Sequence, residues 1–555
     1  MRMKKTTRKQ LRTIRRRRLA LALVGAMAMP MMPVLAQDLP SGYAVVSGDP
    51  VIGSAGNQMT ITQTTKGAII DWGSFNIGMG YGVTFDQQFG SSSVTLNRVG
   101  GGYSASASQI NGTLTSNGNV FIINPAGITF GQDAQVNVGG LVASTLWINS
   151  GDFLTGLTTG QFVFAGFNGD PSTFHEVRND GTITAGAGGV GLVGQSIRNG
   201  GSITSNGGNI VAGAGTQVTL DMFGDGLTQV TINVPPTVDS SIAQENAGSM
   251  IADGGQILLR TAATAGGTGG FIAASGLLRA QSIANVNGRI ELTSIGGPVI
   301  VGAPGFYDDV SSPYTAGLID VSGGPGETGG SVLIQGNGVL MVNDDATPTN
   351  PTNPISVGSM INASGDAGGG QVDIQSSDGV TMYGLSRIVA NADAGTAGQV
   401  SVAAVGSILI QGDISATTKI GGDGGSVGLL STTANLFVLG TISATGANNG
   451  GAVSMFATNG ALGIRGFVSA DGVAGNGGQI AGVAETVILT EDSGVSADGG
   501  GGAGGLIGFR GTTALAAYGL LSAHGNTAGG SIITATDGTF DIRGLFVDAG
   551  ATNGT

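Results

Sequence analysis

The chain has 555 residues, of which 105 are glycine and none is cysteine, and only 10% are charged. Glycine at this frequency without a Gly-X-Y period excludes collagen, the 41% of hydrophobic residues argue against disorder, and the lack of cysteine excludes disulfide cross-links. The composition favours a repetitive β structure with many tight turns, because each glycine in a helix would cost about 1 kcal/mol.

The first 36 residues join a basic segment to an apolar one. Ten of the 22 basic residues lie within the first 18 positions, and an apolar run from Leu19 to Ala36 follows. This order predicts a secretory signal peptide over residues 1–36, with an N-terminal membrane anchor as the alternative. Cleavage before Gln37 would leave 12 basic and 35 acidic residues, a net charge of −23 that disfavours binding to nucleic acid. No later stretch has the 18 uninterrupted apolar residues expected of a membrane span.

Residues 37–290 are predicted to form less regular β structure. Alternating strands are expected at residues 58–62 and 83–85, and Pro235 and Pro236 end a strand at residues 230–234. Four distinctive segments follow one another between residues 70 and 146. They read IDWGSFNIG (70–78), VTLNRV (94–99), GNVFIINPAGITFG (118–131) and VNVGGLVASTL (136–146).

Together these segments resemble the N-terminal secretion domain of the filamentous haemagglutinin family, the exoproteins of two-partner secretion systems. The resemblance covers about residues 40–290 and is strongest over residues 70–146. It implies recognition in the periplasm by an outer-membrane transporter with periplasmic recognition domains, then export to the surface or surroundings of a Gram-negative bacterium. It further implies that the exported chain folds as a right-handed parallel β-helix and acts as an adhesin, with cytolysins and contact-dependent toxins among its relatives.

The family's Asn-Pro-Asn-Gly type of motif falls on residues 124–127, where Ala126 replaces the usual second asparagine. No Asn-Pro dipeptide precedes Asn124, so no role is carried over from the second Asn-Pro motif that some members have. The secretion-motif residues that the resemblance implies are Asn97, Asn124, Pro125, Gly127, Asn137, Gly139 and Gly140.

The residues of this motif also have a purely structural interpretation. Residues 124–127 have the sequence of a type I turn, with Asn first, Pro second and Gly fourth, between strands at 120–123 and 128–130. On this interpretation the motif acts on secretion only through folding. Trp72 and Phe75 are likewise expected in the core or an N-terminal cap rather than at a partner contact, because an uncovered β-helix end is an open sheet edge.

Residues 291–555 are predicted to be parallel β-helix repeats of about 26 residues. A short strand ends in Ser-Ala-x-Gly or a variant, and a Gly-rich turn leads to a second strand. The positions equivalent to the serine are taken as Asn362, Asn391, Ser415, Ser443, Ser469, Ser496, Ser522 and Asp548. This period fits a three-sided coil whose corners use glycine for its positive φ. Residues 345–355 are expected to be a loop between coils.

The residues give little sign of catalysis or of a bound metal or cofactor, and we expect none of these. His175 and His524 lie far apart, and a surface turn is predicted for His524, where other coils carry Thr445 or Asp471. Neighbouring acids along a strand point to opposite faces, so adjacent pairs do not by themselves make a two-carboxylate site. These pairs are 308–309, 344–345 and 491–492. Calcium nonapeptide repeats are disfavoured because residues 421–425 match only in part and the period is wrong.

The sequence thus predicts an all-β chain, with a capped secretion domain at 37–290 and β-helix repeats at 291–555. The predicted function is that of an exported adhesin, with no nucleic-acid partner and an unknown surface ligand. Two alternatives stay open: a β-helical enzyme acting on polysaccharides, and the β-helical carrier part of a larger toxin. Because the last repeat begins near Asp548 and stops in its Gly-rich corner, we expect a longer natural chain, which a stop codon directly after Thr555 would refute.

Overall fold

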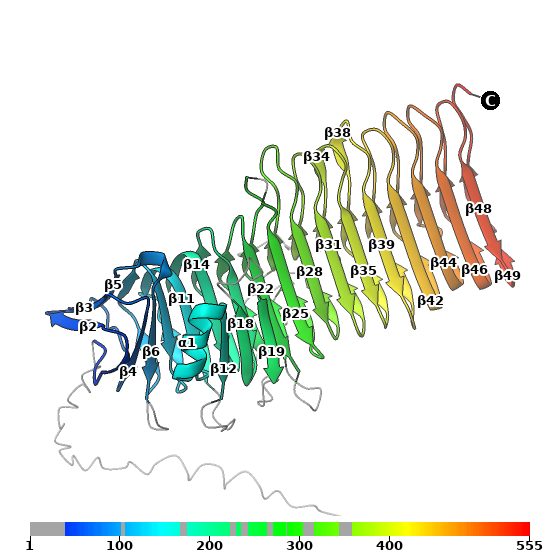
Figure 1. Ribbon diagram of the computed structural model, residues 1–555. Helices are drawn as coiled ribbons and strands as arrows, with labels where there is room; N and C mark the ends of the chain where they lie inside the picture. Colours follow the sequence, from blue (N-terminus) through cyan, green and yellow to red (C-terminus); the bar gives the residue numbers. More distant parts are fainter. Residues whose placement is uncertain are drawn as a thin grey trace, which may run out of the picture. The chain divides into compact units, whose positions relative to one another are not determined.

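The computed structural model describes residues 39–100, 106–166, 175–221, 229–234, 242–263, 270–284, 286–302, 316–342 and 358–554. The predicted signal peptide at 1–36, Pro235 and Pro236, the acidic pairs at 308–309 and 344–345, and the loop at 345–355 lie outside the described residues. Residues 37–555 form one compact unit, and the part of it that is described is a parallel β-helix, as predicted (Figure 1).

Each full coil of this β-helix contributes one strand to each of three columns, which we call columns A, B and C. Within a column, every strand pairs in parallel with the equivalent strand of the next coil. Together the columns hold 45 of the 50 strands that the described chain contains, counting the two antiparallel strands at the N-terminal end. The three-sided coil predicted from the repeat period is therefore confirmed.

Column A contains β3 (Gln58–Gln63), β5 (Gly82–Gln87), β8 (Thr113–Ser116), the first parts of β11 (Gln135–Ser144) and β14 (Thr182–Gly194), β16 (Ser202–Ser205), β21 (Ser249–Ile251), β24 (Leu277–Arg279), β27 (Leu318–Asp320), β30 (Met360–Asn362), β33 (Arg387–Val389), β37 (Asp413–Ser415), β41 (Thr441–Ser443), β43 (Phe467–Ser469), β45 (Gly494–Ser496), β47 (Leu520–Ser522) and β50 (Phe546–Asp548).

Column B contains β4 (Gly67–Trp72), β6 (Val94–Val99), β9 (Asn119–Ile123), the second parts of β11 and β14, β17 (Ile210–Ala214), β22 (Gln256–Ala262), β25 (Arg289–Ile295), β28 (Ser331–Gly336), β31 (Gln371–Ser376), β35 (Gln399–Ala404), β39 (Ser426–Ser431), the first parts of β42 (Ala452–Ile464), β44 (Gln479–Leu489) and β46 (Leu506–Ala517), and β48 (Ser531–Thr536).

Column C contains β7 (Ser108–Ile110), β10 (Ile128–Phe130), β13 (Glu176–Asn179), β15 (Ser196–Asn199), β20 (Ile242–Asn246), β23 (Phe271–Ala274), β26 (Val299–Val301), β29 (Val339–Met341), β32 (Val380–Met382), β36 (Ile408–Ile410), β40 (Leu436–Val438), the second parts of β42, β44 and β46, and β49 (Thr539–Asp541).

The core lies inside the coils and consists of stacked aliphatic side chains. Residues along each strand alternate between inside and outside, so β31 buries its second, fourth and sixth residues. Equivalent inward residues then stack from coil to coil, as Ile414, Ile442, Val468 and Val495 do in column A. One coil alone could not bury this face, and stacking buries it while pairing the backbone groups.

The register corrects one of the predicted repeat positions. Asn362 of β30 pairs with Val389 of β33, and Val389 pairs with Ser415 of β37. The residue equivalent to the repeat serine is therefore Val389, and the prediction of Asn391 was wrong by two residues. Asn391 instead lies at the corner, where its Oδ1 accepts hydrogen bonds from Ser415 Oγ and Thr417 N. The corrected spacings of 27 and 26 residues are more regular than the predicted 29 and 24.

The corner glycines of the repeats also differ from prediction in their physical role. Gly398, Gly425, Gly451 and Gly478 form a column, and none of them has a positive φ. A Cβ atom on each of the last three would lie 2.0 Å from the carbonyl oxygen of the glycine one coil earlier. These positions therefore require glycine because two coils approach closely, not because the backbone is left-handed. Positive φ is confined to a minority of corners, such as Gly421 with φ of 66°.

The N-terminal end of the β-helix is covered by antiparallel strands. β1 (Ala44–Ser47) pairs with β4, and β2 (Val51–Ala55) pairs with β3. Trp72 and Phe75 lie buried here, with their rings 5.6 Å apart in an edge-to-face arrangement. The expectation that both aromatic side chains pack in the core or cap is confirmed.

A second, smaller core lies on the outside of column B and was not predicted. It contains α1 (Ser150–Thr159) and the antiparallel sheet of β12 (Gln161–Ala165), β18 (Gln217–Asp221) and β19 (Gln229–Val234). Phe121 of β9 points outward into this core, and its ring lies 5.9 Å from that of Phe153 and 4.9 Å from that of Phe162. Among the described residues, no helix is long and apolar enough to cross a membrane.

Short extra elements lie at the corners. These are the 3-10 turn η1 (Gly90–Ser92) and the two-stranded sheet of β34 (Ala392–Ala394) and β38 (Thr418–Ile420).

Candidate functional site

The predicted secretion motif at residues 124–127 forms the turn that its sequence suggests. Gly127 N donates to Asn124 O at 3.0 Å, which closes the turn between β9 and β10. Asn124 is fully buried, and its Oδ1 accepts from Ala126 N at 2.9 Å, while its Nδ2 donates to Ser106 O and Ser108 Oγ at 3.0 Å each. The side chain therefore connects this turn to the chain entering β7 in the preceding coil.

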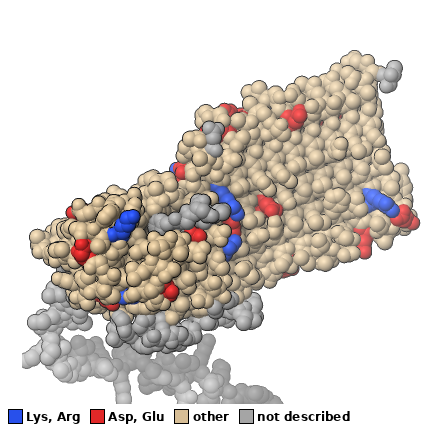
Figure 2. All heavy atoms as spheres, in the orientation of Figure 1, with Lys and Arg blue, Asp and Glu red and all other residues tan. Residues whose placement is uncertain are grey.

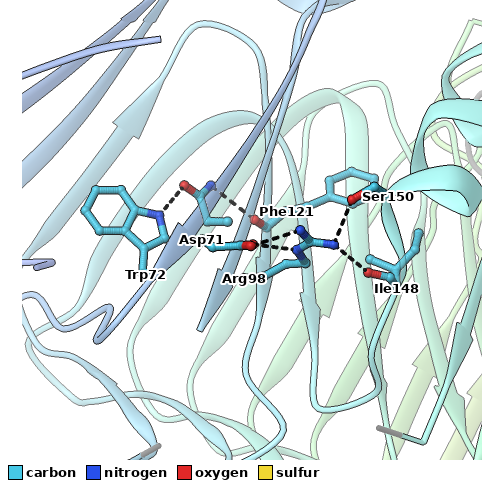
Figure 3. Close-up of polar contacts among 7 residues, drawn as sticks. Asp71, Trp72, Arg98, Phe121, Ile148 and Ser150 are labelled. Atoms are coloured by element: carbon cyan, nitrogen blue, oxygen red, sulfur yellow. Dashed lines mark hydrogen bonds and ion pairs between the residues drawn. The ribbon is translucent and has the colours of Figure 1, made fainter. Parts of the chain in front are cut away.

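Asn97 lies in β6 of column B and is also fully buried. Its Oδ1 accepts the indole N–H of Trp72 at 3.0 Å, and its Nδ2 donates to Phe121 O at 3.1 Å (Figure 3). Trp72, Asn97 and Phe121 belong to three successive strands of column B, β4, β6 and β9. This amide thus links three coils, and removing it would leave the buried indole N–H without its acceptor.

The neighbouring Arg98 forms a cluster that sequence reasoning missed. Its side chain is only 7% exposed, and it forms an ion pair with Asp71 through Nε at 2.7 Å and Nη2 at 3.2 Å. Nη1 donates to Ile148 O and Ser150 Oγ, next to the start of α1 (Figure 3). The sequence signal for this cluster was a single arginine within an otherwise uncharged strand, between Asn97 and Val99. A buried charge in such a strand needs polar or charged partners. The guanidinium connects column B to the outer helix.

The last three predicted residues belong to β11, which turns from column A into column B. Asn137 is exposed on its strand. Gly139 and Gly140 form the bend, where both backbone N–H groups face Gly118 O at 2.9 and 3.3 Å. A Cβ on Gly140 would lie 2.3 Å from Asn119 Oδ1, so this position admits no side chain without movement of Asn119.

The seven predicted residues do not converge on one surface. Asn97, Asn124, Gly127 and Gly140 are buried, Pro125 and Gly139 are half-buried, and Asn137 is exposed. They lie at several corners of successive coils and mostly hold these coils together. A ligand-binding patch made of these seven side chains is therefore not present.

Two further buried polar groups hold the coils of this region together, and both were missed. Gln87 Nε2 donates to Thr95 Oγ1 at 2.8 Å and to Asn119 O at 3.2 Å. Asparagines also stack at one corner, where Asn179 Nδ2 donates to Asn199 Oδ1 at 2.8 Å and Asn199 Nδ2 donates to Asn246 Oδ1 at 2.7 Å. Their spacing of 20 and 47 residues hid the second group from a search for regular repeats.

The titratable side chains of the described residues form no cluster suited to metal binding. No group of three or more histidine and acidic side chains could hold a metal ion there. Burial lowers the pKa of His175. His524 lies at the predicted corner, with Nε2 2.7 Å from Thr552 Oγ1 and Nδ1 3.3 Å from Asp548 Oδ1. Glu491 and Asp492 are exposed in a turn.

Comparison with known proteins places this arrangement in a family. Residues 36–302 match the model of the TPS secretion domain. Two heme/hemopexin-binding proteins of Haemophilus influenzae are 48% and 43% identical to this chain over 110 and 109 residues. These matches span 20% of this chain but only 12% and 11% of the relatives, so most of each relative has no counterpart in them.

A solved structure agrees with the fold and with the family. The crystal structure of the HMW1 secretion domain from Haemophilus influenzae is 27% identical and superposes with a TM-score of 0.56. The superposition covers 71% of this chain and 94% of that domain. The secretion-domain model, the sequence relatives and the superposed structure thus agree with the motifs at residues 70–146. Residues 36–302 therefore belong to the secretion domains of two-partner secretion, whose exoproteins pass the outer membrane of Gram-negative bacteria to the cell surface or the medium.

Proposed function

We propose that this exoprotein is an adhesin whose secretion domain is recognised by a partner outer-membrane transporter with periplasmic recognition domains. The observation that carries the proposal is the long stack of β-helix coils that follows the secretion domain (Figure 1). A stack of this kind presents extended surfaces and needs no active site. We further propose the division into a signal peptide at 1–36, a secretion domain at 37–290 and repeats at 291–555.

The contacts of the secretion-motif residues support an indirect role in export. Asn97, Asn124 and Gly140 join neighbouring coils from buried positions, so their substitution would first alter the stability of the domain. On this proposal the transporter recognises the folding of the N-terminal coils, and the motif matters because it controls that folding. We also propose that the chain is not an enzyme, since the described histidine that contacts both an acid and a hydroxyl, His524, lies with Asp548 and Thr552 at a partly exposed corner.

The proposal is tested by expressing the chain in a Gram-negative host with and without its partner transporter. Mature protein is expected in the medium or on the cell surface only with the partner, and deletion of residues 70–146 should abolish this export. Cells displaying the exported chain should then adhere to surfaces that control cells do not bind. Export without the partner would contradict the secretion mechanism, and normal export without adhesion would contradict the adhesin function alone.

The names of the two Haemophilus relatives suggest binding of heme or hemopexin as a second candidate function. Its support is the 48% identity over 110 residues, a match confined to 12% of that relative's length. Adding hemin or hemopexin to the purified exported chain tests this candidate. A saturable change in the heme absorption spectrum, or a stable complex with hemopexin, would favour it over adhesion.

A further inference from the structure

A shallow groove crosses several coils at the edge of column B. It has a volume of about 660 Å³ and lies where β25, β28, β31 and β35 end. The residues that line it include Ile295, Gln335, Asp373, Gln375, Ser401 and Val405. These residues come from four successive coils, so any ligand that fills the groove runs along the stack and not around one coil.

Three polar side chains of the groove form a chain of hydrogen bonds that joins two neighbouring coils. Gln335 Nε2 donates to Gln375 Oε1 at 2.8 Å, and Gln375 Nε2 donates to Asp373 Oδ2 at 2.6 Å. These bonds orient two amides and a carboxylate, and they leave Gln335 Oε1 and Asp373 Oδ1 as acceptors for a ligand. The hydroxyl of Ser401 has no hydrogen bond within the described chain. The groove therefore offers oriented donors and acceptors to a hydroxylated ligand.

The backbone of these strands offers nothing comparable. β31 pairs with β28 on one side and with β35 on the other over all six of its residues. An extended peptide therefore could not add to the sheet here, because the main-chain groups are already used. Recognition at this groove depends on side chains.

Apolar surface borders the polar group and extends it. Ile295 is 59% exposed and Val405 is 46% exposed at the groove. In register with Gln335 and Gln375, the next three coils present Ala403, Leu430 and Phe456 on the same outer face. Leu430 and Phe456 are each 38% exposed. The stacked outward positions that begin with Gln335 thus carry hydrogen-bonding amides in the first two coils and apolar side chains in the next three.

The charge distribution disfavours an anionic ligand at these positions. Eleven of the twelve basic residues in the described chain form ion pairs with carboxylates, and Lys66 near the N-terminal end is the exception. The groove contains no basic side chain and has Asp373 as its charged residue. Figure 2 shows few charged residues on the visible face of the coil stack. A sulfated or carboxylated chain would meet repulsion here without a compensating cation.

We propose that this groove binds a linear, uncharged polysaccharide that lies across the coils. Its hydroxyl groups would hydrogen-bond with Gln335, Gln375 and Asp373, and the apolar faces of its sugar rings would pack on Val405, Leu430 and Phe456. Polar groups that fix orientation beside apolar contact surface are the usual composition of a binding site. This inference rests on the proposed adhesive function and names the ligand class of that function.

The test measures binding of the full exported chain to defined glycans by calorimetry. The probes are oligosaccharides from cellulose, chitin, linear mannan and dextran, with heparin as the anionic comparator. We expect binding to at least one neutral probe and none to heparin. Gln375→Ala and Phe456→Ala should each weaken binding about tenfold, the effect of losing one hydrogen bond or contact of about 1.4 kcal/mol. Gln371→Ala is the matched control, because Gln371 is exposed on the same strand at the other end and should leave binding unchanged.

Failure of the inference can be separated from failure of the adhesin proposal. If no neutral probe binds, if heparin binds more tightly, or if Gln371→Ala weakens binding as much as Gln375→Ala, the proposed site is wrong. Cells displaying the Gln375→Ala and Phe456→Ala variants are assayed for adhesion in parallel. If both variants lose glycan binding and their cells still adhere, the groove is not the site of adhesion, and the adhesin function stands without it.

Discussion

Substituting one corner glycine by alanine should destabilise the β-helix through a backbone clash. In Gly425→Ala, the new Cβ would lie 2.0 Å from the carbonyl oxygen of Gly398, whereas such contacts essentially never fall below 3.0 Å. The two coils would have to separate locally by about 1 Å, a large fraction of the roughly 4.8 Å spacing between paired strands. The hydrogen bond from Ser426 N to Gly398 O, now 3.1 Å long, would then be lost.

The magnitude follows from the bonds around this contact. Losing two or three backbone hydrogen bonds at about 1 kcal/mol each, in addition to the strain of overpacking, predicts a loss of about 3 kcal/mol. Urea unfolding of the exported chain followed by circular dichroism measures it. Gly508→Ala is the matched control, because a Cβ there meets nothing within 4 Å on the outer face of β46.

The control variant should be neutral or slightly stabilising, because alanine restricts the unfolded chain more than glycine does. Equal urea midpoints for Gly425→Ala and Gly508→Ala would refute the argument that close approach selects glycine. Gly421→Ala separates the two reasons for glycine, because its Cβ meets nothing but its φ is 66°. We expect an intermediate loss there of about 1 kcal/mol, the cost of a left-handed alanine.

Three further predictions concern buried polar groups. Asn124→Ala removes three hydrogen bonds, so it should lower the free energy of unfolding in urea by about 2 kcal/mol and reduce export. Asn137→Ala, at an exposed position, should change neither quantity. Equal export of the two variants would contradict this prediction. Arg98→Met should lower stability by about 2 kcal/mol, because α1 and Asp71 lose their shared partner, and an unchanged urea midpoint would argue against that anchoring role. Burial raises the pKa of Asp471, so the folded state favours the protonated carboxyl, and stability present at low pH is lost as the pH rises through that raised pKa. Asp471→Asn should therefore be more stable than the parent at pH 7, with a difference that shrinks towards pH 3, and a difference that grew on acidification would refute the assignment.

Much of the fold could be predicted because the repeats carry their own register. Strands such as β41 and β43 begin at nearly constant spacing, and their inward isoleucine or valine is unmistakable. Asn391 was misplaced because Val389 replaces the repeat serine, so a search for polar residues chose the nearest asparagine. The physical register follows the inward residue Ile388, which the polar pattern does not show.

The helix α1 illustrates what local sequence could not predict. Its ten residues include two glycines and four Ser or Thr residues, all poor helix formers. The helix forms because Asn149 caps its start, Gly160 ends it in the left-handed conformation, and Phe153 packs into the outer core. These causes depend on residues brought from β9 and β12, which a local pattern does not contain.

The candidate site was predictable as a motif but not as a geometry. The turn at 124–127 was correct because its four residues specify it, and the resemblance located the other positions. Asn97 accepts the indole N–H of Trp72, and Arg98 pairs with the carboxylate of Asp71. Both partners lie 25 to 27 residues away in the sequence, so these contacts arise only from the stacking of coils. The role of these residues in secretion stays a prediction until the variants are assayed.

The glycine column has a consequence for how this molecule can change in length. At this corner, each coil between Gly398 and Gly478 meets its neighbours through the same contact, glycine against glycine carbonyl, so the corner of one coil fits that of the next. Duplicating or deleting one whole coil would therefore create a junction of a kind that already exists. Recombination between repeats could lengthen or shorten the molecule in steps of about 4.8 Å without creating a new type of contact between coils.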